Sequence, residues 1–146
     1  MSRALASLAK PLEFRLFITD DREEFANQNR FPEADIVVND KPEDALPTLP
    51  INPNTFIVVA TRGHRYDNTA LLAAAKTSAK YVGLMGSKRK TILIYEDLMR
   101  SELTKDRIKE IRSPIGLDIR ARTPEEIAIS IMSEILILSI SIGLSL

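Results

Sequence analysis

An uncharged run of residues, Phe56–Thr61 (FIVVAT), limits most strongly what this chain can fold into. Apolar, β-branched runs of this length are typical of a strand buried on both faces of a parallel sheet. Arg62, Gly63 and His64 follow the run directly, and Asp67 comes one helical turn later. In open α/β sheets, ligands bind beyond the carboxyl ends of the strands. The sequence therefore predicts a polar site where this strand ends.

Segments with strand and helix patterns alternate along the chain. This order predicts an α/β fold, a three-layer Rossmann-like domain with a mostly parallel sheet, and we expect a single domain over residues 1–146. Further strands are expected at Glu13–Thr19, Asp35–Val38 and Tyr81–Met85, and helices at Ser2–Lys10, Asn68–Ala79, Thr91–Arg100, Thr104–Ile111 and from Pro124 onward. A short helix or a turn is expected at Arg22–Asn27 and no more than one turn of helix at Asp44–Leu49, and Ser113–Ile119 is expected to be a loop.

Three of the expected helices show start signals. Asn68 or Asp67 is a plausible cap for the alanine-rich helix, and Thr104 for a later one. The segment Thr123–Glu126 (TPEE) has Thr at the N-cap position, Pro at the first helical position and Glu at the third. That pattern predicts a capping box.

The start of the chain departs from the usual dinucleotide-binding order of strand, glycine-rich turn and helix. Here a helix pattern comes first, and no glycine precedes Gly63. The strands at Glu13–Thr19 and Phe56–Thr61 then lack the strand that normally lies between them. Either they pair directly, or another subunit supplies the missing strand, or the chain repacks. We expect a homo-oligomer, because apolar sheet edges and an isoleucine-rich last helix favour association.

Charge and cysteine content restrict the partners and the compartment. Lys and Arg total 20 and Asp and Glu total 20, so no net charge draws the chain to nucleic acid or to an anionic membrane. There is no cysteine, which excludes disulfides and thiolate metal sites and favours a cytoplasmic protein. The N-terminal residues show no apolar signal-peptide pattern. We predict no metal site on this chain.

The segment Ile127–Leu146 is apolar over about the length of a membrane span. It nevertheless contains Glu134 and several serines. Its apolar residues recur at helical spacing, as in Ile127, Ile131, Ile135, Leu138 and Ile142. We therefore expect a buried or interface-forming helix rather than a membrane span.

Four motifs in order resemble the C-terminal Rossmann-like domain of the XdhC/CoxI family, the xanthine dehydrogenase accessory proteins. They read DDREEFANQNRFPEAD, TRGHRYD, YVGLMGSKRK and SPIGLDIRARTPEEIAISIMSEI. The resemblance implies a role in maturing molybdenum hydroxylases, in which the molybdenum cofactor is bound, sulfurated and inserted into the apoenzyme. It covers the chain to about Ile135. Departures are the absent Gly-Ala-Gly-His turn and N-terminal accessory domain, and Arg120 where the family has Gly.

The best candidate site is Arg62, Gly63, His64 and Asp67. Gly63 would let the backbone approach a ligand or turn sharply, and Arg62 would bind a phosphate or carboxylate. His64 would shuttle protons or ligate a metal. The alternative is that His64 only caps the strand and hydrogen-bonds Asp67.

A second candidate is the basic turn Gly86–Lys90 (GSKRK), where a strand meets a helix, and within it Gly86, Ser87 and Lys88 are the residues assigned to the ligand. Free N–H groups of a helix N-terminus, a hydroxyl and nearby cations suit an anion. The turn lacks the Walker pattern, so nucleotide hydrolysis is not implied. The alternative is a solvated first turn.

Two further acidic residues, Asp20 and Asp118, are candidates for ligand binding. Asp20 ends the second expected element, where a Rossmann fold places the acid that binds a ribose hydroxyl. Its neighbour Asp21 would instead cap the following turn. The resemblance alone adds Asp118, on the loop after Gly116, either to close over a pocket or as a structural turn residue.

The function these observations favour is a non-catalytic accessory module that binds a phosphate-bearing cofactor, the molybdenum cofactor, for a molybdenum hydroxylase apoenzyme. An NAD(P)-binding oxidoreductase is the alternative, against which stand the missing phosphate-binding turn and the lack of a Tyr-x-x-x-Lys pair. A third hypothesis is a split half that acts only through a partner chain.

Overall fold

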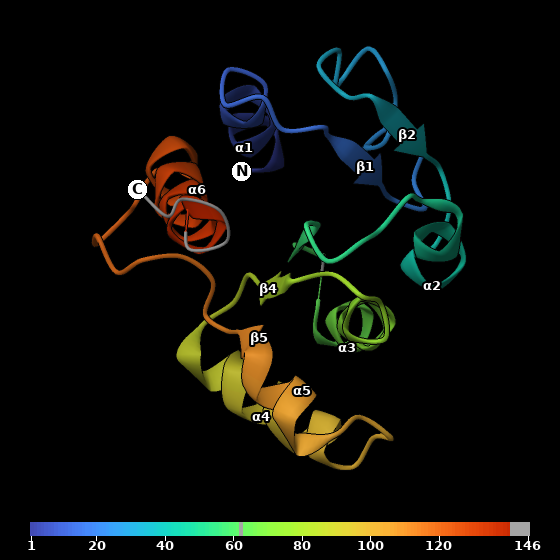
Figure 1. Cartoon of the computed structure of the whole chain (residues 1–146), viewed down its shortest axis with the longest axis vertical. Coiled ribbons are helices and arrows are strands. Elements are labelled where there is room, and N and C mark those ends of the chain that lie inside the picture. The colour runs from blue at the N-terminus through green and yellow to red at the C-terminus, as the bar shows by residue number, and fades with distance from the viewer. Residues whose placement is uncertain (62, 141–146) are drawn as a thin grey trace. The chain divides into compact units, whose positions relative to one another are not determined.

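The computed structural model describes residues 1–61 and 63–140, without the side chains of His64 and Ile140. By its internal contacts the chain divides into two compact units, Met1–Lys41 with the chain from Gly116 onward, and Pro42–Ile115. Helices and strands are interspersed along the chain (Figure 1). Each strand pair among the described residues is parallel. The predicted α/β class with parallel strands is confirmed.

The first unit contains a two-stranded sheet and two main helices. Strands β1 (Phe17–Thr19) and β2 (Ile36–Val38) pair in parallel, and helix α1 (Ser2–Ala9) packs against helix α6 (Pro124–Ile140). A small core forms around Ala6, Phe31 and Ala34. Arg3 pairs with Glu33 and Lys10 pairs with Asp35, which ties α1 to the segment before β2.

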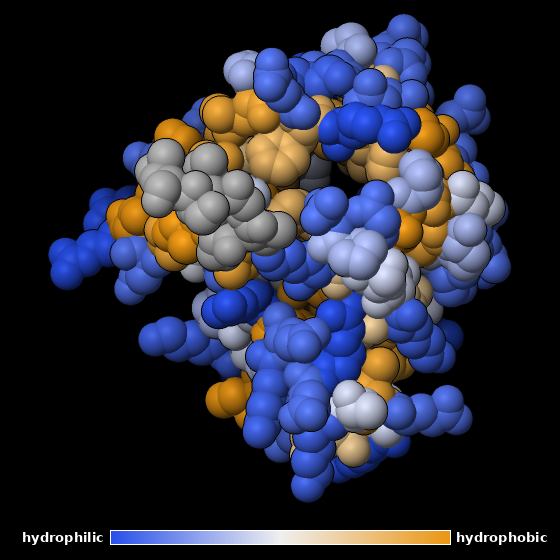
Figure 2. All heavy atoms as spheres, viewed as in Figure 1, coloured by the Kyte–Doolittle hydropathy of each residue, from blue (hydrophilic) through white to orange (hydrophobic). Residues whose placement is uncertain are grey.

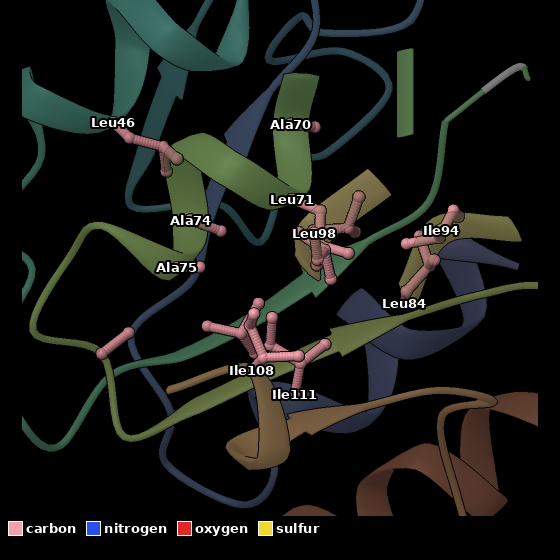
Figure 3. Packing of buried hydrophobic residues seen from close by; sticks show 13 residues of the cluster. Leu46, Ala70, Leu71, Ala74, Ala75, Leu84, Ile94, Leu98, Ile108 and Ile111 are labelled. Atoms are coloured by element: carbon pink, nitrogen blue, oxygen red, sulfur yellow. The ribbon is translucent and has the colours of Figure 1, made fainter. Parts of the chain in front are cut away.

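The second unit contains a three-stranded sheet in the order β3-β4-β5. Its elements are α2 (Pro42–Ala45), a 3-10 helix η1 (Leu46–Thr48), β3 (Phe56–Val59), α3 (His64–Ala75), β4 (Tyr81–Leu84), α4 (Lys88–Met99), α5 (Lys105–Glu110) and β5 (Ile111–Arg112). Figure 3 shows its core, in which leucines, isoleucines and alanines of α3, α4 and α5 pack with Leu84 of β4. Helix α3 follows β3 and helix α4 follows β4, and these two strands are parallel neighbours.

Three strand expectations need correction. Of the strand expected at Glu13–Thr19, only Phe17–Thr19 pairs with β2, and Glu13 has a left-handed backbone with φ 64°. The run was predicted to be buried on both faces, but in β3, at one end of its sheet, Phe56, Ile57 and Val58 are half-buried and Val59 is buried. All four residues of the central β4 are buried. β1 and β3 belong to different sheets, so direct pairing between them is not found among the described residues. The two-residue strand β5 was not expected.

Helices α2, α3 and α4 each begin at an earlier residue than the sequence predicts. α3 begins at His64 with Gly63 at its N-cap, so neither Asn68 nor Asp67 caps it. α4 begins at Lys88, three residues earlier than expected, because Ser87 accepts a hydrogen bond from the N–H of Lys90. The segment expected as one turn at Asp44–Leu49 begins at Pro42 and continues as η1.

The end of α3 is contacted by the side chain of Arg107 from α5. The helix ends at Ala75 instead of the expected Ala79. The Arg107 guanidinium of α5 donates hydrogen bonds to the carbonyls of Ala75, Thr77 and Ala79. The Ala75 carbonyl is one that a helix end leaves without an intrahelical donor, and Thr77 and Ala79 follow the helix. Arg107 therefore satisfies acceptors at the end of α3 and just beyond it.

Two helix starts agree with the sequence. Thr104 accepts a hydrogen bond from the N–H of Arg107 and caps α5 as predicted. The N–H of Glu126 donates to the Thr123 hydroxyl at 3.1 Å, and the N–H of Thr123 donates to the Glu126 carboxylate at 3.0 Å. The predicted capping box is therefore present.

The last helix has buried Ile131 and Ile135, while Ile127 and Leu138 are half-buried. The predicted Ile142 lies outside the described residues. Among the helices that the structure describes, none combines the length and the apolar character needed to cross a membrane. The face drawn in Figure 2 mixes charged and apolar residues, as expected for equal numbers of acidic and basic side chains.

Candidate functional site

The starts of two helices in the second unit meet at one edge of the sheet. β3 and β4 are parallel neighbours with Val59 opposite Leu84. β3 leads through Thr61 and Gly63 into α3, and β4 leads through Gly86 and Ser87 into α4. Polar residues after both strands therefore lie at the carboxyl edge, where α/β sheets bind ligands.

Asp67 is the buried charge at this edge. Its side chain is 0% exposed. The Thr61 hydroxyl donates to its Oδ1 at 2.5 Å, and the Lys90 ammonium forms an ion pair with its Oδ2. Since a buried carboxylate is costly unless it is paired, Thr61 and Lys90 together explain how this charge is tolerated.

The basic turn after β4 is a capped helix start with exposed cations. The N–H of Lys90 donates to the Ser87 hydroxyl oxygen at 3.3 Å, and Thr91 donates to the Ser87 carbonyl from both its N–H and its hydroxyl. Ser87, Lys88 and Arg89 are exposed. Neither Lys88 nor Arg89 forms an ion pair with the residues that the structure describes. Their charges and the free helix N–H groups can act together on an anion.

The two glycines of the site have different surroundings. A Cβ atom on Gly63 would meet nothing within 4 Å, and the residue is extended with φ 167°. The structure therefore shows open space beside Gly63 and no turn that requires glycine. A Cβ atom on Gly86 would lie 3.0 Å from Cδ of Lys90. Gly86 thus leaves room for the Lys90 side chain.

Arg62 and His64 are the two predicted site residues whose side chains the structure does not describe. Arg62 lies outside the described residues, and His64 is described only as the first residue of α3. Their predicted ligand contacts, and the alternative of a hydrogen bond between His64 and Asp67, stay predictions.

Asp20 follows β1 in the first unit, and its carboxylate is engaged by Arg22. The guanidinium donates to both carboxylate oxygens at 2.9 and 3.0 Å, and the backbone N–H of Arg22 donates to Oδ1 at 2.9 Å. Partial burial acts to raise the pKa of Asp20, but the bonds from Arg22 outweigh it and lower the pKa below its ordinary value. The carboxylate thus already has the partners that a ribose would need to replace.

Asp118 is exposed and accepts a hydrogen bond from the N–H of Arg120 at 3.3 Å. The loop before it is attached to α6: the N–H of Gly116 donates to Glu134, and the Ser130 hydroxyl donates to the Leu117 carbonyl. The contacts of Asp118 are those of a turn residue. Its predicted ligand role is not tested by them.

The predicted site residues therefore fall into separate groups. Gly63, Asp67, Gly86, Ser87 and Lys88 come together in the second unit, whereas Asp20 and Asp118 belong to the first. Sequence reasoning missed Thr61 and assigned Lys90 to anion binding, whereas in the structure both residues contact Asp67. The local pattern gives no signal for the pair of Lys90 with Asp67, because the two residues belong to different helices.

These features define a parallel α/β protein of the Rossmann-like class with an anion-compatible helix start. The sequence profile of the XdhC Rossmann domain matches residues 1–135, and the chain belongs to this family.

Proteins similar to this chain in sequence or structure are consistent with the family. A Bacillus subtilis (strain 168) protein whose name describes a probable xanthine dehydrogenase subunit is 33% identical over 132 residues, which are 90% of this chain and 38% of that protein. An uncharacterized Escherichia coli (strain K12) protein, YqeB, is 31% identical over 137 residues, 93% of this chain and 25% of that protein. A crystal structure described as a xanthine dehydrogenase from Bacillus halodurans has a TM-score of 0.81 and 31% identity, covering 95% of this chain and 41% of that one. The chain therefore spans a quarter to about two fifths of the length of these relatives.

Proposed function

We propose that this chain is a non-catalytic accessory module that binds a phosphate-bearing cofactor at the start of α4. The supporting observation is the pair of exposed cations, Lys88 and Arg89, which have no ion pair among the described residues. Cations in the first turn of a helix oppose its dipole, at a cost of about 0.3–1 kcal/mol each. An anionic ligand that both cations and the free N–H groups contact would offset this cost.

The family suggests what that ligand is. Two of the similar proteins are named as xanthine dehydrogenases or their subunits. We therefore propose the molybdenum cofactor, which contains a phosphate group, as the ligand, and a molybdenum hydroxylase apoenzyme as the partner. The module would assist insertion or sulfuration of the cofactor. Ser87, Lys88 and Arg89 would contact the phosphate, and Arg62 and His64 stay predicted ligand contacts.

The test is a direct binding measurement with matched variants. The protein is mixed with molybdenum cofactor, separated by gel filtration, and assayed for the bound pterin by fluorescence. Lys88→Met should weaken binding about tenfold, the loss expected for one charge-assisted hydrogen bond. Lys105→Met, which removes an exposed cation from the first turn of α5, is the control and should bind as the unmodified chain does. Equal binding by all three proteins would place the cofactor elsewhere.

The alternative, an NAD(P)-binding oxidoreductase domain, is supported by the parallel strands and by the position of Asp20 directly after β1. Titration with NADH and NADPH distinguishes the two functions. Tight binding with turnover of a carbonyl substrate would favour the oxidoreductase. A split half that works only with a partner chain is the third proposal, and co-purification of a single defined partner from the native cell would support it.

A further inference from the structure

We propose that Asp67 and Lys90 are positioning residues of the anion site, and that Lys90 itself does not contact the ligand. This inference rests on the proposed function, since it assigns roles within the same turn. The basic run Lys88–Lys90 suggests three equivalent cations in the sequence. In the structure, one of the three has a partner and the other two have no ion pair among the described residues.

Releasing the Lys90 ammonium from the Asp67 carboxylate would be costly. Its ammonium is paired with a carboxylate that is 0% exposed, and the side chain of Lys90 is itself 25% exposed. If a ligand drew the ammonium away, the Asp67 charge would stay buried with the Thr61 hydroxyl as its one side-chain donor among the described residues. An unpaired buried charge is strongly unfavourable. The pair with Asp67 therefore opposes any ligand contact by Lys90.

The Lys90 side chain passes close to the turn before α4. Cδ of Lys90 lies where it would be 3.0 Å from a Cβ atom at position 86. The methylene chain thus passes close to the backbone of Gly86 on its way to Asp67. The N–H of Lys90 also donates to the Ser87 hydroxyl oxygen. One residue therefore contacts the turn before α4 at two successive positions.

Together these contacts link the starts of two helices. Asp67 is in the first turn of α3, and its N–H donates to the Gly63 carbonyl at 3.0 Å. Lys90 is in the first turn of α4. The ion pair between them fixes the turn at Gly86 and Ser87 relative to the end of β3. The neighbouring cations, Lys88 and Arg89, then stay exposed and available to an anion.

The experiment uses the full chain and inorganic pyrophosphate, with affinity measured by calorimetry. Lys90→Met retains the methylene chain but leaves Asp67 without its counter-charge, and pyrophosphate should bind about tenfold more weakly. Asp67→Asn combined with Lys90→Met removes both charges and keeps an acceptor for Thr61. This double variant should return to within about threefold of the unmodified affinity, because no ligand contact has been removed. Lys88→Met should stay weak whether or not the pair is replaced.

If the double variant binds as weakly as Lys90→Met, Lys90 is a ligand contact and the positioning role is wrong. Circular dichroism establishes that each variant is folded.

Failure of the proposed function gives a different result. If the unmodified chain binds no pyrophosphate, the anion site itself is disproved. The positioning role is then judged by hydrogen exchange of the amides from Ser87 to Thr91. Faster exchange in Lys90→Met, restored in the double variant, supports it, and unchanged exchange in Lys90→Met overturns it.

Discussion

Lys90 in the first turn of α4 forms an ion pair with the buried carboxylate of Asp67 in the first turn of α3. The two residues are brought together because β3 and β4 are parallel neighbours whose following helices start at the same edge. The Thr61 hydroxyl completes the surroundings of the carboxylate.

The ion pair predicts a large stability effect for one substitution and a small one for its control. Lys90→Met should lower the free energy of unfolding by about 2–3 kcal/mol, below the full cost of breaking a buried pair because Lys90 is partly exposed. Lys105→Met should change it by less than about 0.5 kcal/mol. Urea unfolding followed by circular dichroism gives both values. A loss for Lys90→Met no larger than for Lys105→Met would contradict the importance of the pair.

Arg120 predicts a stabilising substitution. Its φ is 57°, a left-handed conformation that costs a side-chain-bearing residue about 1–2 kcal/mol and glycine almost nothing. This conformation explains why glycine at position 120 suits the motif. Arg120→Gly should stabilise the protein by about 0.5–1 kcal/mol after the greater chain entropy of glycine in the unfolded state is subtracted. Thermal unfolding measures the change. Arg122→Gly, at an exposed neighbouring position, is the control and should not stabilise.

Asp35 predicts a dependence of stability on pH. Hydrogen bonds from the Leu16 N–H and from Lys10 lower the pKa of its carboxyl group, against a smaller opposing effect of burial. Because the folded pKa is below the unfolded one, the unfolded state binds more protons between the two values. The stabilisation is therefore complete above the ordinary pKa of about 4 and is lost as pH falls through the folded pKa.

Urea midpoints measured from pH 2.5 to 6 check this expectation. Asp35→Asn should reduce the dependence on pH, because the residue no longer titrates. A curve of unchanged steepness in Asp35→Asn would show that other carboxyl groups, such as Asp20, account for the acid sensitivity.

The proposed homo-oligomer predicts a specific response on α6. Ile129 and Ile137 are 49% and 56% exposed on this helix. If copies associate through α6, Ile137→Glu should give a monomer in light scattering at micromolar concentration, because a charge at an interface core is strongly unfavourable. Ile92→Glu on α4, where the side chain is 62% exposed, should leave the oligomeric state unchanged. A monomeric unmodified chain would end the proposal.

Sequence alone determined the features that depend on neighbouring residues. The alternation of strands and helices, the capping box at Thr123 and Glu126, and the Thr104 cap were all predictable, because each depends on residue types a few positions apart. The motifs also indicated the family, which the comparisons confirm.

Only the tertiary structure decided what depends on segments far apart in the chain. Arg107 of α5 binds the carbonyl of Ala75 at the end of α3, and three of the four β3 residues are half-buried at the end of their sheet. Lys90 is equivalent to Lys88 and Arg89 in the local sequence pattern, but in the structure it pairs with the buried carboxylate of Asp67 from another helix. Pairing, burial and edge position are properties of the packed chain, and the local pattern of residue types does not contain them.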